Sequence, residues 1–162
     1  LHVRSRRQRQ MCIRDRGNNW RSGEFGHMVI HPEGRKCYCG KKGCVDAYCS
    51  ALRLADMEDG ILEKFFVHLK EGSEEHKKVW EEYMENLALT VDNLRMIFDM
   101  DVVLGGYVGC YMEPHIPELQ KRLSELDIFE RRGNYVRACG CRSEASAFGS
   151  AIYQMEKYIE SI

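Results

Sequence analysis

The sequence predicts an α/β fold in which helices flank a mainly parallel sheet. MDVVLGG (100–106) is a short apolar run closed by two glycines, which is typical of a buried strand that enters a tight turn. NYVRACG (134–140) predicts a further strand, and a helix is expected between the two. Strands that alternate with helices favour a parallel arrangement. The length of 162 residues suits one ordinary domain.

The N-terminal elements are expected to be a strand, a loop and two helices. FGHMVI (25–30) has the apolar, β-tolerant character of a strand, and Pro32 and Gly34 are expected to end it. A loop rich in cysteine follows. VDAYCSALRLA then permits a short helix after Cys44, and ILEKFFVHLKEG predicts a second helix that ends at Gly72.

Three further helices are expected, and the first of them has the clearest pattern. Ser73 is the expected cap, and apolar residues recur at steps of three and four over about 25 residues; they are Val79, Trp80, Tyr83, Met84, Leu87, Val91, Leu94 and Phe98. Pro114 is expected to open a helix through Leu126. Ser143 is expected to cap a last helix that runs to about Ile159.

Charge is distributed unevenly along the chain. Residues 1–16 hold six arginines and one acid, whereas the remainder carries 18 basic and 24 acidic residues. We interpret residues 1–16 as an atypical basic tail, disordered or not native. The first residues lack the apolar core of a signal peptide, and no apolar run approaches the roughly 18 residues of a membrane span. A cytoplasmic location is therefore expected, where clustered thiols are more often metal ligands than disulfides.

The cysteine cluster predicts a structural zinc site. Cys37, Cys39 and Cys44 form a C-x-C-x4-C pattern, and structural zinc takes four thiolate or imidazole ligands in a tetrahedron. The spacing alone leaves the fourth ligand open among His27, His31 and Cys49. The remaining cysteines show no ligand pattern and are expected to be free thiols; they are Cys12, Cys110, Cys139 and Cys141.

GEFGH followed by C-x-CG-x-x-GC-x-D resembles the signature of the ROK family of bacterial sugar kinases and sugar-responsive repressors. Glu24 and His27 match the E-x-G-H of the family, and the three cysteines of the cluster match its cysteines. VVLGG (102–106) and SEASAFGSAIYQ (143–154) resemble its second nucleotide-contacting turn and its closing helix. The resemblance covers residues 17–162. It implies the C-terminal lobe of an actin-like (ribonuclease H-like) ATPase fold, with a mixed sheet and a zinc-binding loop.

The resemblance also implies roles for individual residues. His27 would ligate zinc through one ring nitrogen and contact a sugar hydroxyl through the other, while Glu24 would accept hydrogen bonds from adjacent hydroxyls. Asp46 stands where the family usually has a glutamate that contacts the sugar. Gly105 and Gly106 would contact the nucleotide. The implied cofactors are structural zinc here and ATP with magnesium in the full-length parent.

The features that the family places further upstream decide the expected activity. The sequence before Glu24 contains no D-x-G-x-T phosphate loop and no counterpart of the catalytic aspartate of the family. The chain is therefore expected to be the C-terminal half of an ATP-dependent hexose or amino-sugar kinase, inactive by itself and with no catalytic residue assigned. The alternatives are the sugar-sensing half of a ROK-type repressor and a stand-alone zinc-stabilised binding module. A sugar partner and a homodimer are expected; nucleic-acid and membrane binding are not.

Overall fold

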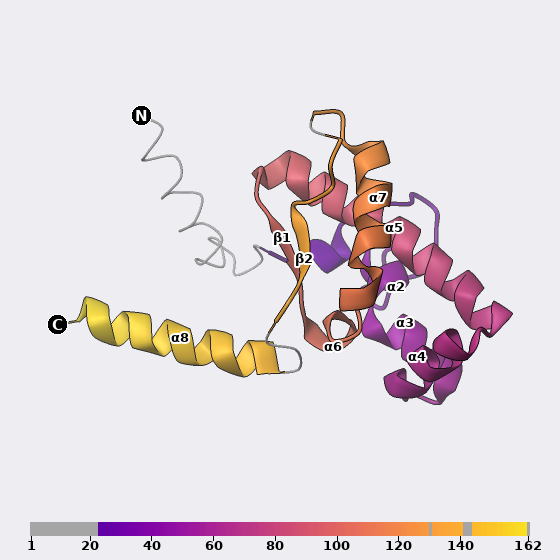
Figure 1. The fold of residues 1–162 in the computed structure, drawn as a ribbon, viewed down its shortest axis with the longest axis horizontal. Coiled ribbons are helices and arrows are strands. Elements are labelled where there is room, and N and C mark those ends of the chain that lie inside the picture. Colours follow the sequence, from indigo (N-terminus) through magenta and orange to yellow (C-terminus); the bar gives the residue numbers. More distant parts are fainter. Residues whose placement is uncertain (1–22, 130, 141–143, 162) are drawn as a thin grey trace. The chain divides into compact units, whose positions relative to one another are not determined.

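The structure is a computed structural model that describes residues 23–129, 131–140 and 144–161 (Figure 1). The arginine-rich tail, Cys12, Cys141 and the expected helix cap Ser143 lie outside the described residues. The chain divides into two compact units, Leu1–Ala47 and Tyr48–Ile162. Within the described residues, no helix has the length and apolar character needed to cross a membrane.

In the first unit, the prediction of a strand at residues 25–30 is wrong. Phe25–His27 forms the 3-10 helix η1, which is held by hydrogen bonds from His27 N to Glu24 O (3.1 Å) and from Met28 N to Phe25 O (3.0 Å). Val29 makes a single antiparallel bridge to Cys44. An apolar run becomes a strand only where a partner strand satisfies its backbone groups. Here a local turn satisfies those of residues 25–28, while Met28 O and Ile30 N bond to Val45 N and Gly43 O in the cysteine loop. α2 (Asp46–Cys49) follows the cysteine loop.

The second unit begins with a series of helices at the expected places. α3 (Ala51–Ala55) is capped by Ser50, whose Oγ accepts a hydrogen bond from Arg53 N, and leads into η2 (Asp56–Glu58). α4 (Leu62–Glu71) ends as predicted at Gly72, where φ is 92° and the left-handed backbone favours glycine. α5 (Glu74–Phe98) is the long helix that the periodicity predicted.

The described sheet has two strands. β1 (Val102–Leu104) pairs in parallel with β2 (Val136–Ala138), with Val102 opposite Val136 and Leu104 opposite Ala138. The connection between them contains α6 (Gly106–Gly109), η3 (Glu113–His115) and α7 (Ile116–Leu126). The predicted strands, their parallel pairing and the end of the helix at Leu126 are therefore confirmed.

The core of the second unit lies where α5 packs against α4 and α7 (Figure 1). The predicted apolar face of α5 supplies Trp80, Tyr83, Met84, Leu87 and Val91, all buried. Aromatic rings stack within this core, with Trp80 on Tyr83 and Phe66 on Tyr111. The largest fully buried side chains are Phe65, Leu54, Met84, Met112, Leu119, Leu123, Val91 and Val136, apart from Cys44 in the first unit.

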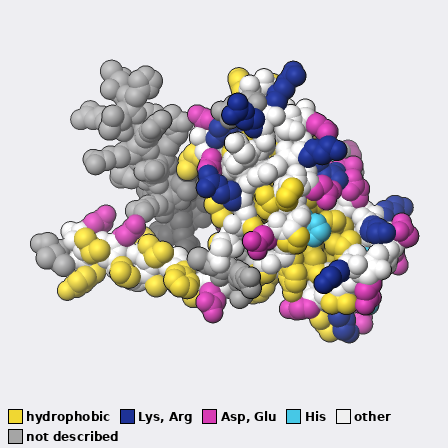
Figure 2. Space-filling model, viewed as in Figure 1, with side chains coloured by type: hydrophobic (Ala, Val, Ile, Leu, Met, Phe, Trp, Pro, Cys, Tyr) yellow, Lys and Arg dark blue, Asp and Glu magenta, His cyan; other side chains and the backbone are white. Residues whose placement is uncertain are grey.

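The last helix, α8 (Ala145–Glu160), agrees with the sequence prediction in position and length. Large hydrophobic side chains along it are exposed, and Figure 2 shows them as a row on the helix. They are Phe148, Ile152, Tyr153, Met155, Tyr158 and Ile159.

Candidate functional site

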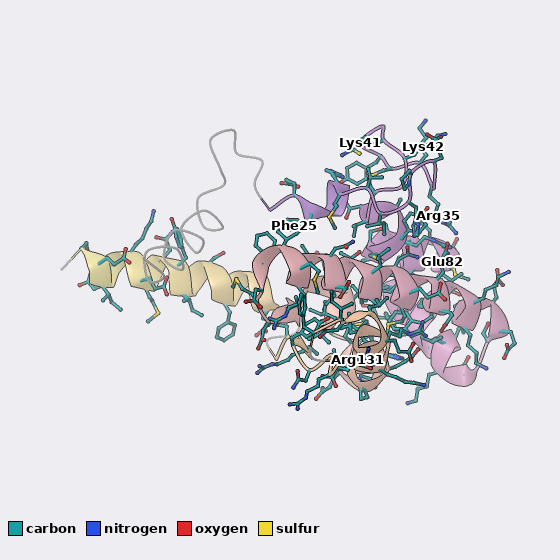
Figure 3. The ribbon with its side chains drawn as sticks, turned by 90° about the horizontal axis from the view of Figure 1, so that it is seen from above. Phe25, Arg35, Lys41, Lys42, Glu82 and Arg131 are labelled. Atoms are coloured by element: carbon teal, nitrogen blue, oxygen red, sulfur yellow. The ribbon has the colours of Figure 1, made fainter. Side chains whose placement is uncertain are left out.

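The cysteine loop is folded by short turns. Cys37 N donates to Lys41 O (2.8 Å), Gly40 N donates to Cys37 O (3.0 Å), and Lys36 and Lys42 form an antiparallel bridge. Figure 3 shows Lys41 and Lys42 on this loop. The Lys41 ammonium donates to the carbonyl oxygen of His27 at 2.7 Å, which ties the loop to η1. These contacts bring distant parts of the first unit together.

The loop gathers one imidazole and three thiols into a group that fits a metal ion. One ligand atom from each of His27, Cys37, Cys39 and Cys44 lies within 4.8 Å of the other three. The Sγ atoms of Cys39 and Cys44 are 3.7 Å apart. Thiolates bound to tetrahedral zinc at about 2.3 Å lie about 3.8 Å apart, so both the donor set and this spacing suit zinc.

The geometry also selects one of the three candidates that the spacing left open for the fourth metal ligand. His27 Nδ1 lies 3.9 Å from Cys37 Sγ, and the ligand group contains His27 but neither His31 nor Cys49. The carbonyl oxygen of His31 instead accepts a hydrogen bond from Gly34 N (2.9 Å). Cys49 belongs to the second unit, where its Sγ contacts the carbonyl oxygen of Tyr83.

The thiols of the group differ in their environment. Cys37 and Cys44 are buried and Cys39 is exposed. Burial raises the pKa of the Cys44 thiol to about 11, whereas a hydrogen bond from the backbone of Lys41 lowers the pKa of the Cys39 thiol. Thiolate is the metal-binding form, so binding of a cation by this group has to release protons.

The other ring nitrogen of His27 faces a tyrosine that the sequence analysis missed. The hydroxyl group of Tyr38 lies 3.3 Å from His27 Nε2 and donates to Asp46 Oδ2 at 3.1 Å. The hydrogen bond to Asp46 is the main reason why the pKa of Tyr38 is raised. Its position between Cys37 and Cys39 was the available signal, because a residue between two ligands must lie beside the metal group.

Asp46 approaches η1 so closely that Gly26 leaves no room for a side chain. A Cβ atom at Gly26 would lie 2.7 Å from Asp46 Cγ and 2.8 Å from Asp46 Oδ2. The same carboxylate has its Oδ2 atom 3.8 Å from His27 Nδ1. Glu24, which is exposed, immediately precedes this turn. The structure thus places Glu24, His27 and Asp46 around one short segment.

Gly26→Ala is expected to destabilise this segment by about 1–3 kcal/mol, because the new methyl group overpacks against the Asp46 carboxylate. Amide hydrogen exchange of residues 25–30 and 44–46 measures the cost. Asp46→Ala removes the colliding group and is the matched background, in which Gly26→Ala should cost much less. An equal cost in both backgrounds would contradict the contact.

The glycine pair expected at the nucleotide lies at the carboxyl end of β1. Gly105 has an extended backbone, and Gly106 has a φ of 73° with no atom within 4 Å of an added Cβ. The Tyr107 side chain is 78% exposed, so it does not crowd the turn. A cavity of about 550 Å³ is lined by Tyr107, Cys110 and Tyr111, among others.

Comparison with known proteins places these features in a family. A family model described as the ROK family matches residues 12–157. The chain belongs to the ROK family. N-acetylmannosamine kinases from Citrobacter koseri and Escherichia coli are 30% and 31% identical to it over 94 residues. These alignments cover 54% of this chain and 32% of each kinase. The chain thus spans about a third of the length of the curated relatives that it matches.

Solved structures of ROK sugar kinases show the same fold. A ROK family glucokinase from Streptomyces griseus, in complex with glucose and AMPPNP, matches with a TM-score of 0.63 and 22% identity, over 76% of this chain and 48% of the glucokinase. A ROK hexokinase from Thermus thermophilus matches with a TM-score of 0.53 and 24% identity, over 68% and 39%. The expected actin-like α/β class is confirmed, and the chain contains a ROK domain like that of sugar kinases.

Proposed function

We propose that this ROK chain is the C-terminal lobe of an ATP-dependent kinase for a hexose or an amino sugar. In this proposal, structural zinc holds the loop that binds the sugar. The named relatives support the substrate class, since they are N-acetylmannosamine kinases, a glucokinase and a hexokinase. The arrangement of the first unit supports a metal held by the thiols and His27, and a sugar held by His27 and the carboxylates beside it.

The observation that carries the proposal is the orientation of the His27 ring. Its Nδ1 atom faces the thiols and its Nε2 atom faces the hydroxyl group of Tyr38. Zinc bound at Nδ1 would hold the ring in place, and the neutral ring would then carry its proton on Nε2. Nε2–H is thereby a donor to an oxygen atom such as that of a sugar hydroxyl. The metal has an orienting role in this arrangement and activates no water.

The carboxylates beside His27 provide the complementary acceptors. In the proposed complex, Glu24 accepts hydrogen bonds from neighbouring sugar hydroxyls. Asp46 already accepts a hydrogen bond from one hydroxyl group, that of Tyr38, at 3.1 Å. Tyr38 is 81% exposed, so its ring has room to turn away when a sugar hydroxyl takes its place. We assign the nucleotide to the turn at Gly105 and Gly106, where the open left-handed backbone leaves space for phosphate to approach.

Glu24→Gln is expected to weaken sugar binding about 10- to 100-fold, because hydrogen bonds to a charged group contribute about 1.5–3 kcal/mol. The measurement is titration of the zinc-loaded protein with N-acetylmannosamine and glucose, followed by the NMR shifts of the His27 ring and the loop amides. Glu33→Gln is the matched control. This exposed acid lies on the same loop and pairs with Lys42 at 2.9 Å, and its replacement should leave sugar affinity unchanged.

Phosphate transfer is tested with a coupled assay of ADP release, with ATP and the same sugars. The full-length parent is expected to phosphorylate at least one hexose or amino sugar, whereas residues 1–162 alone are expected to be inactive. If neither sugar shifts the His27 signals and no sugar of the panel is phosphorylated, the proposed function is wrong.

A further inference from the structure

A second group of histidine and carboxylate side chains, types that can ligate a metal, lies in the helical unit, on elements that contain none of the zinc-loop residues. Glu58 ends η2, His68 lies in the last turn of α4, and His76 lies in the first turn of α5. His68 Nδ1 and His76 Nε2 each lie 2.8 Å from the same oxygen, Glu58 Oε1. The three ligand atoms are all within 4.8 Å of one another. Two imidazoles and a carboxylate therefore converge on one point.

The group is partly enclosed, with one side open. The side chains of His76 and Glu58 are 9% and 15% exposed, whereas that of His68 is 42% exposed. The ring of Phe65 packs against that of His76, with 5.2 Å between centroids. An ion at this point would have protein on one side and water beside His68. Two histidines and one glutamate with a remaining water position form an established zinc ligand set.

A contact outside the group fixes the orientation of the most buried ligand. Ser73 Oγ lies 2.8 Å from His76 Nδ1. If His76 Nδ1 carries the proton and donates it to Ser73 Oγ, Nε2 presents its lone pair to the group. Metal-bound histidines nearly always have such a partner on the second nitrogen. Ser73 thereby supports a ligand here and makes no side-chain hydrogen bond to the backbone of α5.

A hydrogen-bonded cluster without metal is the alternative. In that case both rings donate N–H to Glu58 Oε1, and His76 Nδ1 accepts from the Ser73 hydroxyl, which can donate or accept. Ligand atoms bound to tetrahedral zinc at about 2.1 Å lie about 3.4 Å apart. The observed 2.8 Å contacts thus need to open by roughly half an ångström, which rotation of the exposed His68 ring and the Glu58 carboxylate can supply.

We propose that Glu58, His68 and His76 bind a divalent transition-metal ion such as Zn²⁺, with water completing the coordination on the side of His68. This site is separate from the thiol group and independent of the sugar-kinase proposal. Its ligands come from three consecutive elements, η2, α4 and α5. A bound ion therefore clamps the α4–α5 hairpin to the turn before it, and should raise the stability of the second unit by binding only its folded form.

The test uses zinc binding to the full chain in a background that lacks the thiol site. The Cys44→Ser variant is titrated with Zn²⁺ against a chromophoric chelator, and is compared with Cys44→Ser/His68→Ala and, as the matched control, Cys44→Ser/His115→Ala. His68 is half exposed, so its replacement should leave the fold intact. One zinc per chain is expected in Cys44→Ser and in the His115 control, with affinity at least about tenfold weaker without His68.

Two further readouts keep the result decisive. Co²⁺ bound to thiolates gives intense charge-transfer absorption, so binding of Co²⁺ without that absorption identifies the imidazole and carboxylate site even if Cys44→Ser retains some metal. The melting temperature of the Cys44→Ser variant should also rise with added Zn²⁺, and should rise less at the same zinc concentration when His68 is replaced. Equal zinc affinity with and without His68 would overturn the proposal. So would the absence of zinc binding at about 100 μM, because a dissociation constant of this size requires only about 5.5 kcal/mol of binding free energy.

Discussion

Cys44→Ser is expected to release the metal from the cysteine loop and to unfold that loop. The side chain of Cys44 is fully buried, and its residue also forms the single bridge to Val29. Structural zinc sites supply about 10–16 kcal/mol of apparent binding free energy, which exceeds the stability of many whole domains. Removing a residue that only hydrogen-bonds to a metal ligand costs about 10- to 100-fold in metal affinity. Removing a thiolate ligand itself should therefore weaken zinc binding by more than about 100-fold.

The measurements are metal content at the thiol site, from the charge-transfer absorption of bound Co²⁺, and amide hydrogen exchange of residues 27–46. Both should change in Cys44→Ser and not in Cys110→Ser, which removes a thiol outside the ligand group. The buried core of the second unit contains no residue of the loop, so its cooperative unfolding, followed by Trp80 fluorescence, should persist. Full metal binding with a protected loop in Cys44→Ser would contradict the assigned ligand set.

The long helix and the grouping of the three thiols were predictable because each depends on local sequence. Apolar residues at steps of three and four define one face of α5, and that face is the one that the structure buries. The cysteines lie within eight residues of one another, so any loop that brings their Sγ atoms together is short. Glycines at the required turns, such as Gly40 with a φ of 90°, make that loop possible.

The strand expected at residues 25–30 failed for a reason that is not local. Whether Val29 pairs with a strand or with one residue depends on what lies beside it, and among the described residues its bridge partner is Cys44. The group of Glu58, His68 and His76 was missed for the same reason. Its members are ten and eight residues apart on three elements, and their convergence depends on how η2, α4 and α5 turn relative to one another.

Gly43→Ala is expected to weaken zinc binding far more than Gly40→Ala, although both glycines have left-handed backbones. Their φ angles are 74° and 90°. An alanine in this region costs about 1–2 kcal/mol of backbone strain at either position. At Gly40 an added Cβ meets nothing within 4 Å, whereas at Gly43 it would overlap the carbonyl group of His31. Both alanine variants therefore carry the backbone strain, and only the variant at Gly43 also carries the collision.

The collision cannot be relieved by turning a side chain, because both partners are backbone. Gly43 O accepts hydrogen bonds from Ile30 N (2.8 Å) and His31 N (3.2 Å), so the two segments are held together at this point. Separating them moves Cys44, the next residue, away from the other ligands. Overpacking adds about 1–3 kcal/mol or more to the strain, so Gly43→Ala should lose more than about 100-fold in zinc affinity.

Competition with a chromophoric chelator measures both affinities in the same buffer. Gly40→Ala, as the matched control, should lose about 10-fold, the equivalent of roughly 1.4 kcal/mol of strain alone. The difference between the variants then reports the close approach of residues 31 and 43, separately from the backbone angle. Equal losses in the two variants would show that the left-handed conformation alone matters, and that the contact between Gly43 and His31 does not position Cys44.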